Sequence, residues 1–126
     1  MSVVRVLLVD DQAPFRRAMR AVVAETAGFR VVGEASSGEE SVLAASELLP
    51  DLVLMDVNLP GIDGLEATRR MRRRRSSPVV LLLSTYDDDA GAHFVAECGA
   101  AAYVTKSALG PDRLNEVWAA AGGKGA

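Results

Sequence analysis

Three aspartates, a serine and a lysine stand directly after short apolar runs of this 126-residue chain. Asp10 and Asp11 follow residues 3–9, Asp56 follows residues 52–55, Ser84 follows residues 79–83, and Lys106 follows residues 102–105. Taken singly, an aspartate or a serine after a strand is often a helix N-cap or a turn residue. Chance alone does not account for all five standing after apolar runs, so we interpret them as one site.

The carboxylates of this set indicate a metal ion. Asp10, Asp11 and Asp56 would repel one another in one pocket, so burying them together requires a cation. Carboxylate oxygens without histidine or cysteine ligands suit Mg²⁺ better than zinc or copper. The single histidine, His93, and the single cysteine, Cys98, fall in a helical stretch that does not join this set. We therefore predict Mg²⁺ as the cofactor.

Lys106 and Ser84 extend this chemistry to a phosphate group. The chain has only one other lysine, Lys124, and a compact ammonium suits a phosphate oxygen or a carboxylate in a pocket. A nucleophilic aspartate, a metal, a hydroxyl and a lysine together predict phosphoryl transfer through an acyl phosphate. The sequence has no GxxxxGK[ST] loop, so a nucleotide is not the expected donor.

Five apolar runs must position these side chains, and amphipathic stretches separate them. The runs are residues 3–9, 30–33, 52–55, 79–83 and 102–105. Between them the apolar residues have helical spacing, as at Phe15, Met19 and Val22, and residues 36–40 have a capping-box pattern. This alternation predicts an α/β fold, (βα)5, with a parallel sheet covered on both faces. Five strands are too few for a barrel, so we expect an open doubly wound sheet with ligands at the strand ends.

Composition places the chain among globular proteins. Its 49% apolar residues and net charge of −3 predict one domain at residues 1–121, with a flexible tail at 122–126. The weak charge gives no general attraction to nucleic acid or anionic membranes. Neither a membrane span nor a signal peptide is predicted, and one cysteine fits a reducing compartment, so we expect a cytoplasmic location. Six arginines within residues 69–75 are interpreted as a solvated helix end.

The chain resembles the receiver domains of bacterial two-component response regulators over nearly its whole length, from Val3 to about Ala121. The matching motifs are Asp10-Asp11, MDVNLPGIDG at residues 55–64, Ser84-Thr85, and YVTK at residues 103–106. Each motif is weak alone, but four in this order and spacing are specific. The resemblance implies a flavodoxin-like strand order 2-1-3-4-5.

The resemblance also implies how the acidic residues act. Asp56 would accept a phosphoryl group from a histidine kinase. Mg²⁺ would be held by Asp11, Asp56 and the main-chain carbonyl of Asn58, with Asp10 helping through water.

Further roles implied by the resemblance concern the phosphoryl group and its fate. Ser84 and Lys106 would each contact a phosphoryl oxygen. Tyr103 would rotate inward on activation and remodel the surface of the last two helices and the strand between them. The hydrolytic water would pass Asn58, Thr85 and Tyr86, which would tune the lifetime of the acyl phosphate.

One departure from the family pattern bears on the output. Ser107 follows Lys106, whereas much of the family has proline at this position. The peptide bond after this lysine is commonly cis in the family, and the sequence does not decide between cis and trans for Lys106–Ser107. A polar residue at this position resembles the subgroup that carries a C-terminal helix-turn-helix. We therefore expect a downstream protein partner or a missing output domain, with transcription regulation as its role. A homodimer would use the surface of the last three elements or that of the first and last helices, and this domain alone would bind no DNA.

Two alternatives remain open. The first is a phosphorylation-independent binding module with the same fold, although all five pocket residues are present. The second is a phosphohydrolase with an aspartyl nucleophile, but such enzymes typically carry a second aspartate two residues on, where this chain has Asn58. We expect a phosphorylation-dependent switch and not a turnover enzyme.

Overall fold

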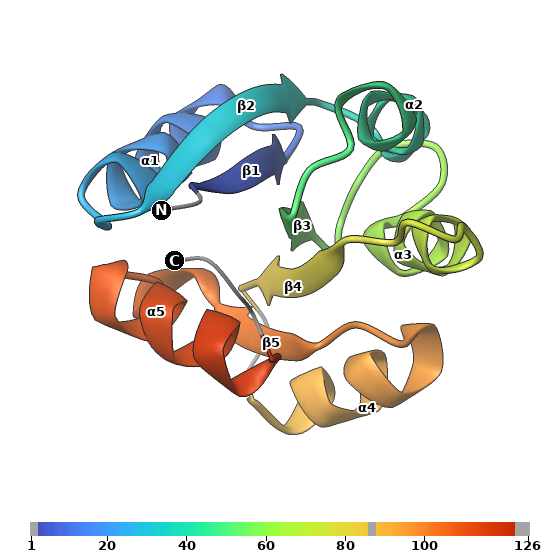
Figure 1. Ribbon diagram of the computed structural model, residues 1–126. Coiled ribbons are helices and arrows are strands. Elements are labelled where there is room, and N and C mark those ends of the chain that lie inside the picture. The colour runs from blue at the N-terminus through green and yellow to red at the C-terminus, as the bar shows by residue number, and fades with distance from the viewer. Residues whose placement is uncertain (1–2, 86–87, 123–126) are drawn as a thin grey trace.

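A computed structural model describes residues 3–85 and 88–122, in which five strands alternate with five helices. The strands are β1 (Val4–Val9), β2 (Phe29–Ala35), β3 (Leu52–Asp56), β4 (Val79–Ser84) and β5 (Ala102–Thr105). The helices are α1 (Ala13–Ala24), α2 (Gly38–Leu48), α3 (Gly64–Arg72), α4 (Asp88–Cys98) and α5 (Pro111–Ala120), and a 3-10 turn, η1 (Lys106–Ala108), follows β5 (Figure 1). This order confirms the predicted (βα)5 fold. Among the described helices, none has the length and apolar character needed to cross a membrane.

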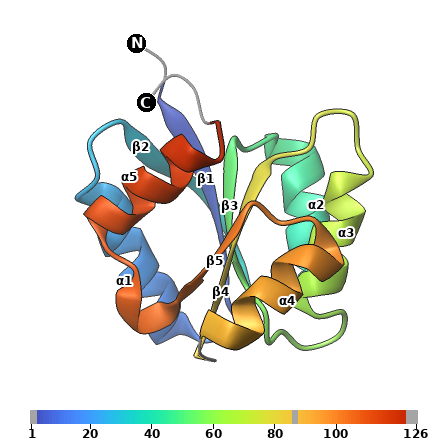
Figure 2. The same ribbon diagram turned by 90° about the horizontal axis from the view of Figure 1, so that it is seen from below.

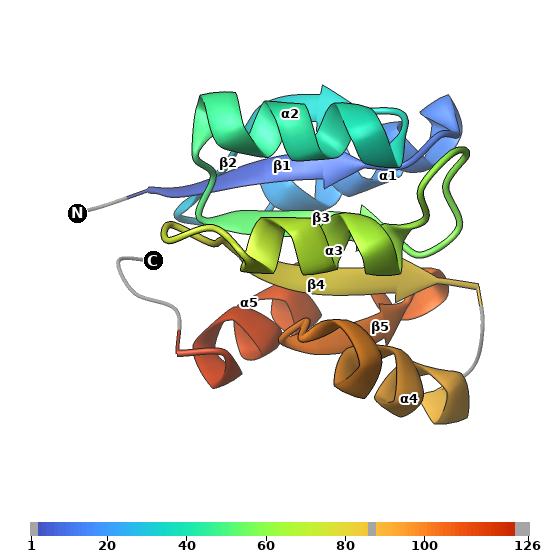
Figure 3. The same ribbon diagram turned by 90° about the vertical axis from the view of Figure 1, so that its right-hand side faces the viewer.

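The strands form one parallel sheet in the order β2-β1-β3-β4-β5, which confirms the predicted flavodoxin-like topology. Helices α1 and α5 cover one face, and α2, α3 and α4 cover the other (Figure 2). All arrowheads in Figure 3 point to the same edge of the sheet, which we call the carboxyl edge. In open α/β sheets ligands bind outside this edge.

Each face of the sheet contributes its own half of the core, because successive side chains of a strand point to opposite faces. On β1, Leu8 packs with the half that contains Leu114 of α5, whereas Leu7 packs with the half that contains Met71 of α3. Strand β3 lies between β1 and β4 and is buried along its whole length. A side chain at the end of β3 is therefore held by a rigid support.

The strands extend further at the carboxyl edge than the apolar runs predict. Asp56 belongs to β3 and pairs with Leu83, and Ser84 belongs to β4 and pairs with Thr105. From the apolar runs alone, both residues are expected just beyond the strand ends. Their inclusion follows from backbone pairing with neighbouring strands, which continues past the last apolar side chain. Strand pairing thus fixes the backbone of two polar site residues.

Two local sequence patterns take the predicted form. The Ser37 side chain caps α2 by accepting from the Glu40 N–H at 3.1 Å, and the Glu40 carboxylate accepts from the Ser36 N–H at 2.6 Å. The arginine run ends α3, where Arg69 and Arg70 both pair with Glu66. The four arginines that follow, residues 72–75, are exposed, as predicted for a solvated helix end.

Candidate functional site

The three aspartates meet at the carboxyl edge. One carboxylate oxygen from each of Asp10, Asp11 and Asp56 lies within 4.8 Å of the others. Because Val9 of β1 pairs with Met55 of β3, the residues that follow these two in the chain, Asp10 and Asp56, come side by side. Asp10 is 0% and Asp56 3% exposed, whereas Asp11 faces solvent. Strand register therefore builds the predicted acidic cluster.

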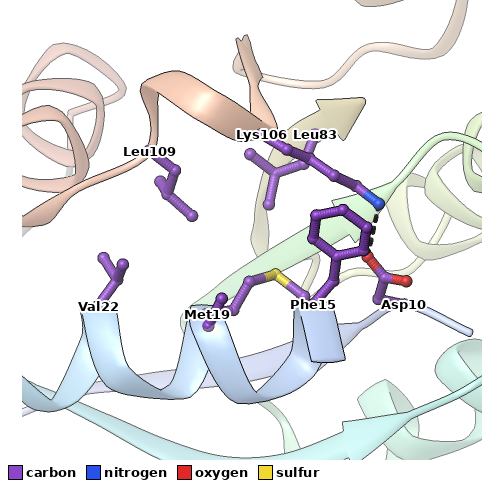
Figure 4. A pocket seen from close by; sticks show the side chains of 8 residues that line it. Asp10, Phe15, Met19, Val22, Leu83, Lys106 and Leu109 are labelled. Carbon is purple, nitrogen blue, oxygen red and sulfur yellow. Dashed lines mark ion pairs between the residues drawn. The ribbon is translucent and has the colours of Figure 1, made fainter. Parts of the chain in front are cut away.

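Lys106 brings a positive charge to this cluster. Its Nζ lies 2.8 Å from Asp10 Oδ2 and 3.5 Å from Asp56 Oδ2, and 3.9 Å from the centre of the Phe15 ring (Figure 4). The Asp10 contact is an ion pair that joins the ammonium to a fully buried carboxylate. The Lys106–Ser107 peptide bond is trans.

Asp56 has a perturbed carboxyl group. Burial, followed by the nearby charge of Asp10, raises its pKa from 3.8 to about 6. The charge of Lys106 and the Asn58 N–H, which donates to Asp56 Oδ1 at 3.1 Å, act in the opposite direction. Three carboxylates face one ammonium here, so a divalent cation would relieve the remaining repulsion.

A hollow of about 220 Å³ opens in front of Asp56. Its lining consists of Asp11, Gln12, Phe15, Asp56, Asn58, Thr85 and Lys106. The predicted residues Asn58 and Thr85 thus lie beside the acidic cluster, while Tyr86 lies outside the described residues. The Asp56 side chain therefore borders a hollow that it shares with Asp11 and Lys106.

Phe15 belongs to this site although its spacing assigned it only to the apolar stripe of α1. Its ring lies under the Lys106 ammonium, and a cation over an aromatic face is electrostatically favourable. It also lines a narrow pocket of about 50 Å³ with Met19, Val22 and Leu109 (Figure 4). The signal that could have found Phe15 is its place in the first turn after Asp11, because that turn must begin at the carboxyl edge.

Ser84 and Tyr103 are absent from the lining of the hollow. Ser84 is fully buried on β4, next to Leu83, the strand partner of Asp56. Tyr103 is half-buried on β5, and its ring lies 6.1 Å from that of Phe94 in α4. Tyr103 lines a separate hollow of about 360 Å³ that also includes Arg113 of α5. The structure therefore places Tyr103 at the surface between α4 and α5.

Comparisons with known sequences agree with this geometry. The family model described as the response regulator receiver domain matches residues 6–118. The chain is 44% identical over 105 residues to the response regulator GacA of Pseudomonas viridiflava, covering 83% of this chain and 49% of GacA. It is 37% identical over 121 residues to the transcriptional regulatory protein LiaR of Bacillus subtilis (strain 168), covering 96% of this chain and 57% of LiaR. The chain thus spans about half the length of these relatives.

Solved structures show the same arrangement. The signal receiver domain of the response regulator NarL from Mycobacterium tuberculosis has a TM-score of 0.88 and 29% identity, covering 98% of this chain and 100% of that one. The response regulator domain of Thermotoga maritima CheB has a TM-score of 0.85 and 26% identity, covering 98% and 99%. With the acidic cluster in place and the family model matching nearly its whole length, the chain belongs to the response regulator receiver domain family of two-component signalling.

Proposed function

We propose that Asp56 is the phosphoacceptor of this receiver domain and that its phosphorylation switches the domain between two signalling states. The observation that supports this most directly is the position of Asp56. Its carboxylate ends the buried strand β3 and lines the hollow that Lys106 and Asp11 also line. A nucleophile held in this way needs little reorganisation when a donor arrives.

The donor set at the carboxyl edge fits Mg²⁺. Asp10, Asp11 and Asp56 each offer a carboxylate oxygen within one small cluster, and the main-chain carbonyl of Asn58 would complete an all-oxygen site. When bound, Mg²⁺ would neutralise negative charge on the phosphoryl group.

We expect the phosphoryl donor to be a phosphohistidine of a kinase. An oxygen of Asp56 would form the new O–P bond while the P–N bond breaks and returns its electron pair to the imidazole. Because the pKa of Asp56 is about 6, the carboxylate is ionised at neutral pH and needs no separate base. Lys106 would move from Asp10 to a phosphoryl oxygen, and the Ser84 hydroxyl would donate to another. Asn58, Thr85 and Tyr86 would set how quickly water removes the group.

A downstream partner would detect the signalling state at the surface formed by α4, β5 and α5. Tyr103 lies on this surface in contact with Phe94, so its rotation would change what a partner meets there. The matched parts are only 49% of GacA and 57% of LiaR, and LiaR is named as a transcriptional regulatory protein. We therefore propose a cytoplasmic role in transcription regulation, with DNA bound by another domain. Dimerisation through this surface, or through α1 and α5, would be one way to transmit the signal.

Phosphorylation by acetyl phosphate tests the proposal. Intact mass spectrometry should show the gain of one phosphoryl group that depends on Mg²⁺, and peptide mapping should place it on Asp56. The Asp56→Asn variant should gain none. If wild-type protein gains no group, or gains it at another residue, Asp56 is not the phosphoacceptor.

A second assay separates the switch from a phosphohydrolase. Asn58 stands two residues after Asp56 and has no acidic proton to give a leaving group, so we expect no multiple-turnover release of phosphate from small phosphomonoesters. Sustained release that is lost in Asp56→Asn would favour the enzyme instead.

A further inference from the structure

A network of charged groups ties the start of α1 to the end of β2. Arg16 of α1 donates from Nη1 to the carbonyl oxygen of Asp10 at 2.7 Å and from Nε to Glu34 Oε1 at 3.2 Å. Glu34 Oε2 accepts from Nε of Arg20 at 2.8 Å. The Arg16 and Glu34 side chains are 22% and 27% exposed, against 49% for Arg20. Arg16 is therefore the better shielded of the two arginines, and it alone of the pair bonds to Asp10.

The carbonyl that Arg16 holds belongs to the peptide group between Asp10 and Asp11. This group follows β1. The N–H of Asp10, which belongs to the preceding peptide group, donates to the Ala35 carbonyl at 3.1 Å. A peptide group is planar, so fixing its carbonyl oxygen also fixes the directions to both flanking α-carbons. The contact with Arg16 therefore constrains how the Asp10 and Asp11 side chains lie relative to each other.

We infer that Arg16 is a positioning residue for the metal site, an inference that rests on the proposed function. By bridging β2 and the Asp10 carbonyl, it holds the Asp10–Asp11 peptide so that both carboxylates face Asp56. An arginine suits this task because its planar guanidinium bonds two acceptors in fixed directions, whereas a lysine ammonium acts as a point charge. The side-chain contacts of Arg16 in the described part of the chain are to the Asp10 carbonyl and to Glu34, and not to the carboxylates of the acidic cluster.

A positioning role and a purely electrostatic role of Arg16 predict opposite changes in Mg²⁺ affinity when Arg16 is removed. Removing a positive charge near three carboxylates should strengthen the binding of Mg²⁺ if charge alone matters. Releasing the Asp10–Asp11 peptide should weaken it, because the carboxylates must then be ordered when the ion binds. Arg20 provides a matched control, since it shares Glu34 and carries the same charge but does not contact Asp10.

The experiment compares Arg16→Ala, Arg16→Lys and Arg20→Ala with the wild-type protein. Mg²⁺ affinity is measured by calorimetry without any phosphoryl donor, and amide hydrogen exchange at Asp11 and Gln12 is measured by NMR without metal. For Arg16→Ala we expect roughly tenfold weaker Mg²⁺ binding, as is common when groups that orient ligands are lost, and faster exchange. Arg16→Lys keeps the charge, so its Mg²⁺ affinity and exchange rates should lie between those of wild-type protein and Arg16→Ala. Arg20→Ala should bind Mg²⁺ as tightly as wild-type protein, or more tightly.

The outcomes separate this inference from the proposed function. If wild-type protein binds no Mg²⁺, the proposed metal site fails and the inference fails with it. If wild-type protein binds Mg²⁺ but Arg16→Ala binds it equally well or better, only the inference is overturned. Equal weakening in Arg16→Ala and Arg20→Ala would also overturn it, because the shared contact with Glu34 would then explain the loss. Urea unfolding will show whether each variant is folded. If Arg16→Ala does not fold, the comparison of Arg16→Lys with wild-type protein tests the inference.

Discussion

Replacing Asp56 by asparagine should stabilise the metal-free protein at neutral pH. Asparagine has nearly the same shape as aspartate but carries no charge, so the variant avoids burying an ionised group beside Asp10. The pKa of Asp56 is raised from 3.8 to about 6. A shift of roughly 2 units corresponds to about 3 kcal/mol, at 1.36 kcal/mol per unit, which is the upper end of the expected gain.

The gain should depend on pH with a defined sign. Below about pH 4 the Asp56 carboxyl is protonated in both the folded and the unfolded protein, so the substitution should change little. Between about pH 4 and 6 the unfolded state loses its proton first, so the stability of wild-type protein falls relative to that of the variant. Above pH 6 both states are ionised, and the difference should stay constant.

Urea unfolding followed by tryptophan fluorescence measures this difference. Trp118 is 7% exposed and packs edge-on against Phe29, so its emission reports loss of the core. The series runs from pH 4 to 8 with EDTA. The control is Asp112→Asn, which removes an exposed carboxylate from the first turn of α5 and should give only a small loss of stability. Excess Mg²⁺ should reduce or reverse the advantage of Asp56→Asn, because the ion stabilises wild-type protein. A variant that is less stable than wild-type at every pH would refute the reasoning.

Three further substitutions probe the supports of the site. Lys106→Met removes the cation beside Asp10 and Asp56, so the pKa of Asp56 should rise above its present value. A carbon-13 NMR titration of the carboxyl group measures this pKa, and a lower value in the variant would contradict the assigned pairing. Gly64→Ala would drive a methyl group into the Asp56 carbonyl, so we expect a loss of about 1–3 kcal/mol in urea unfolding from overpacking, and wild-type stability would contradict this close approach. Glu39→Ala removes the acceptor of the Ile62 N–H, now 3.1 Å away, and should speed amide exchange at Ile62; Glu39→Gln should restore much of the protection, and equal exchange in all three proteins would argue against the contact.

Local pattern determined the fold class and the members of the acidic cluster. Short apolar runs alternate with stretches whose apolar residues have helical spacing. Each pattern can be recognised within a few residues, and their alternation predicts a parallel sheet. In such a sheet every carboxyl end lies at one edge, so Asp10, Asp11, Asp56 and Lys106 could be assigned to one site from the sequence by itself. The structure confirms their proximity. The switch role of Tyr103 stays a prediction, because its position at the α4–α5 surface is only one of the two states that the role requires.

Only the tertiary structure decided which groups pair within the site. Lys106 Nζ lies nearer to Asp10 than to Asp56, Phe15 lies beneath it, and Arg16 holds the Asp10 carbonyl. Phe15 and Arg16 have ordinary places in the pattern of an amphipathic helix, so composition and spacing do not distinguish them from core and surface residues. Their partners are set by strand register and by the direction in which α1 leaves the sheet. Both depend on how the helices and strands pack against one another, which no local stretch of sequence encodes.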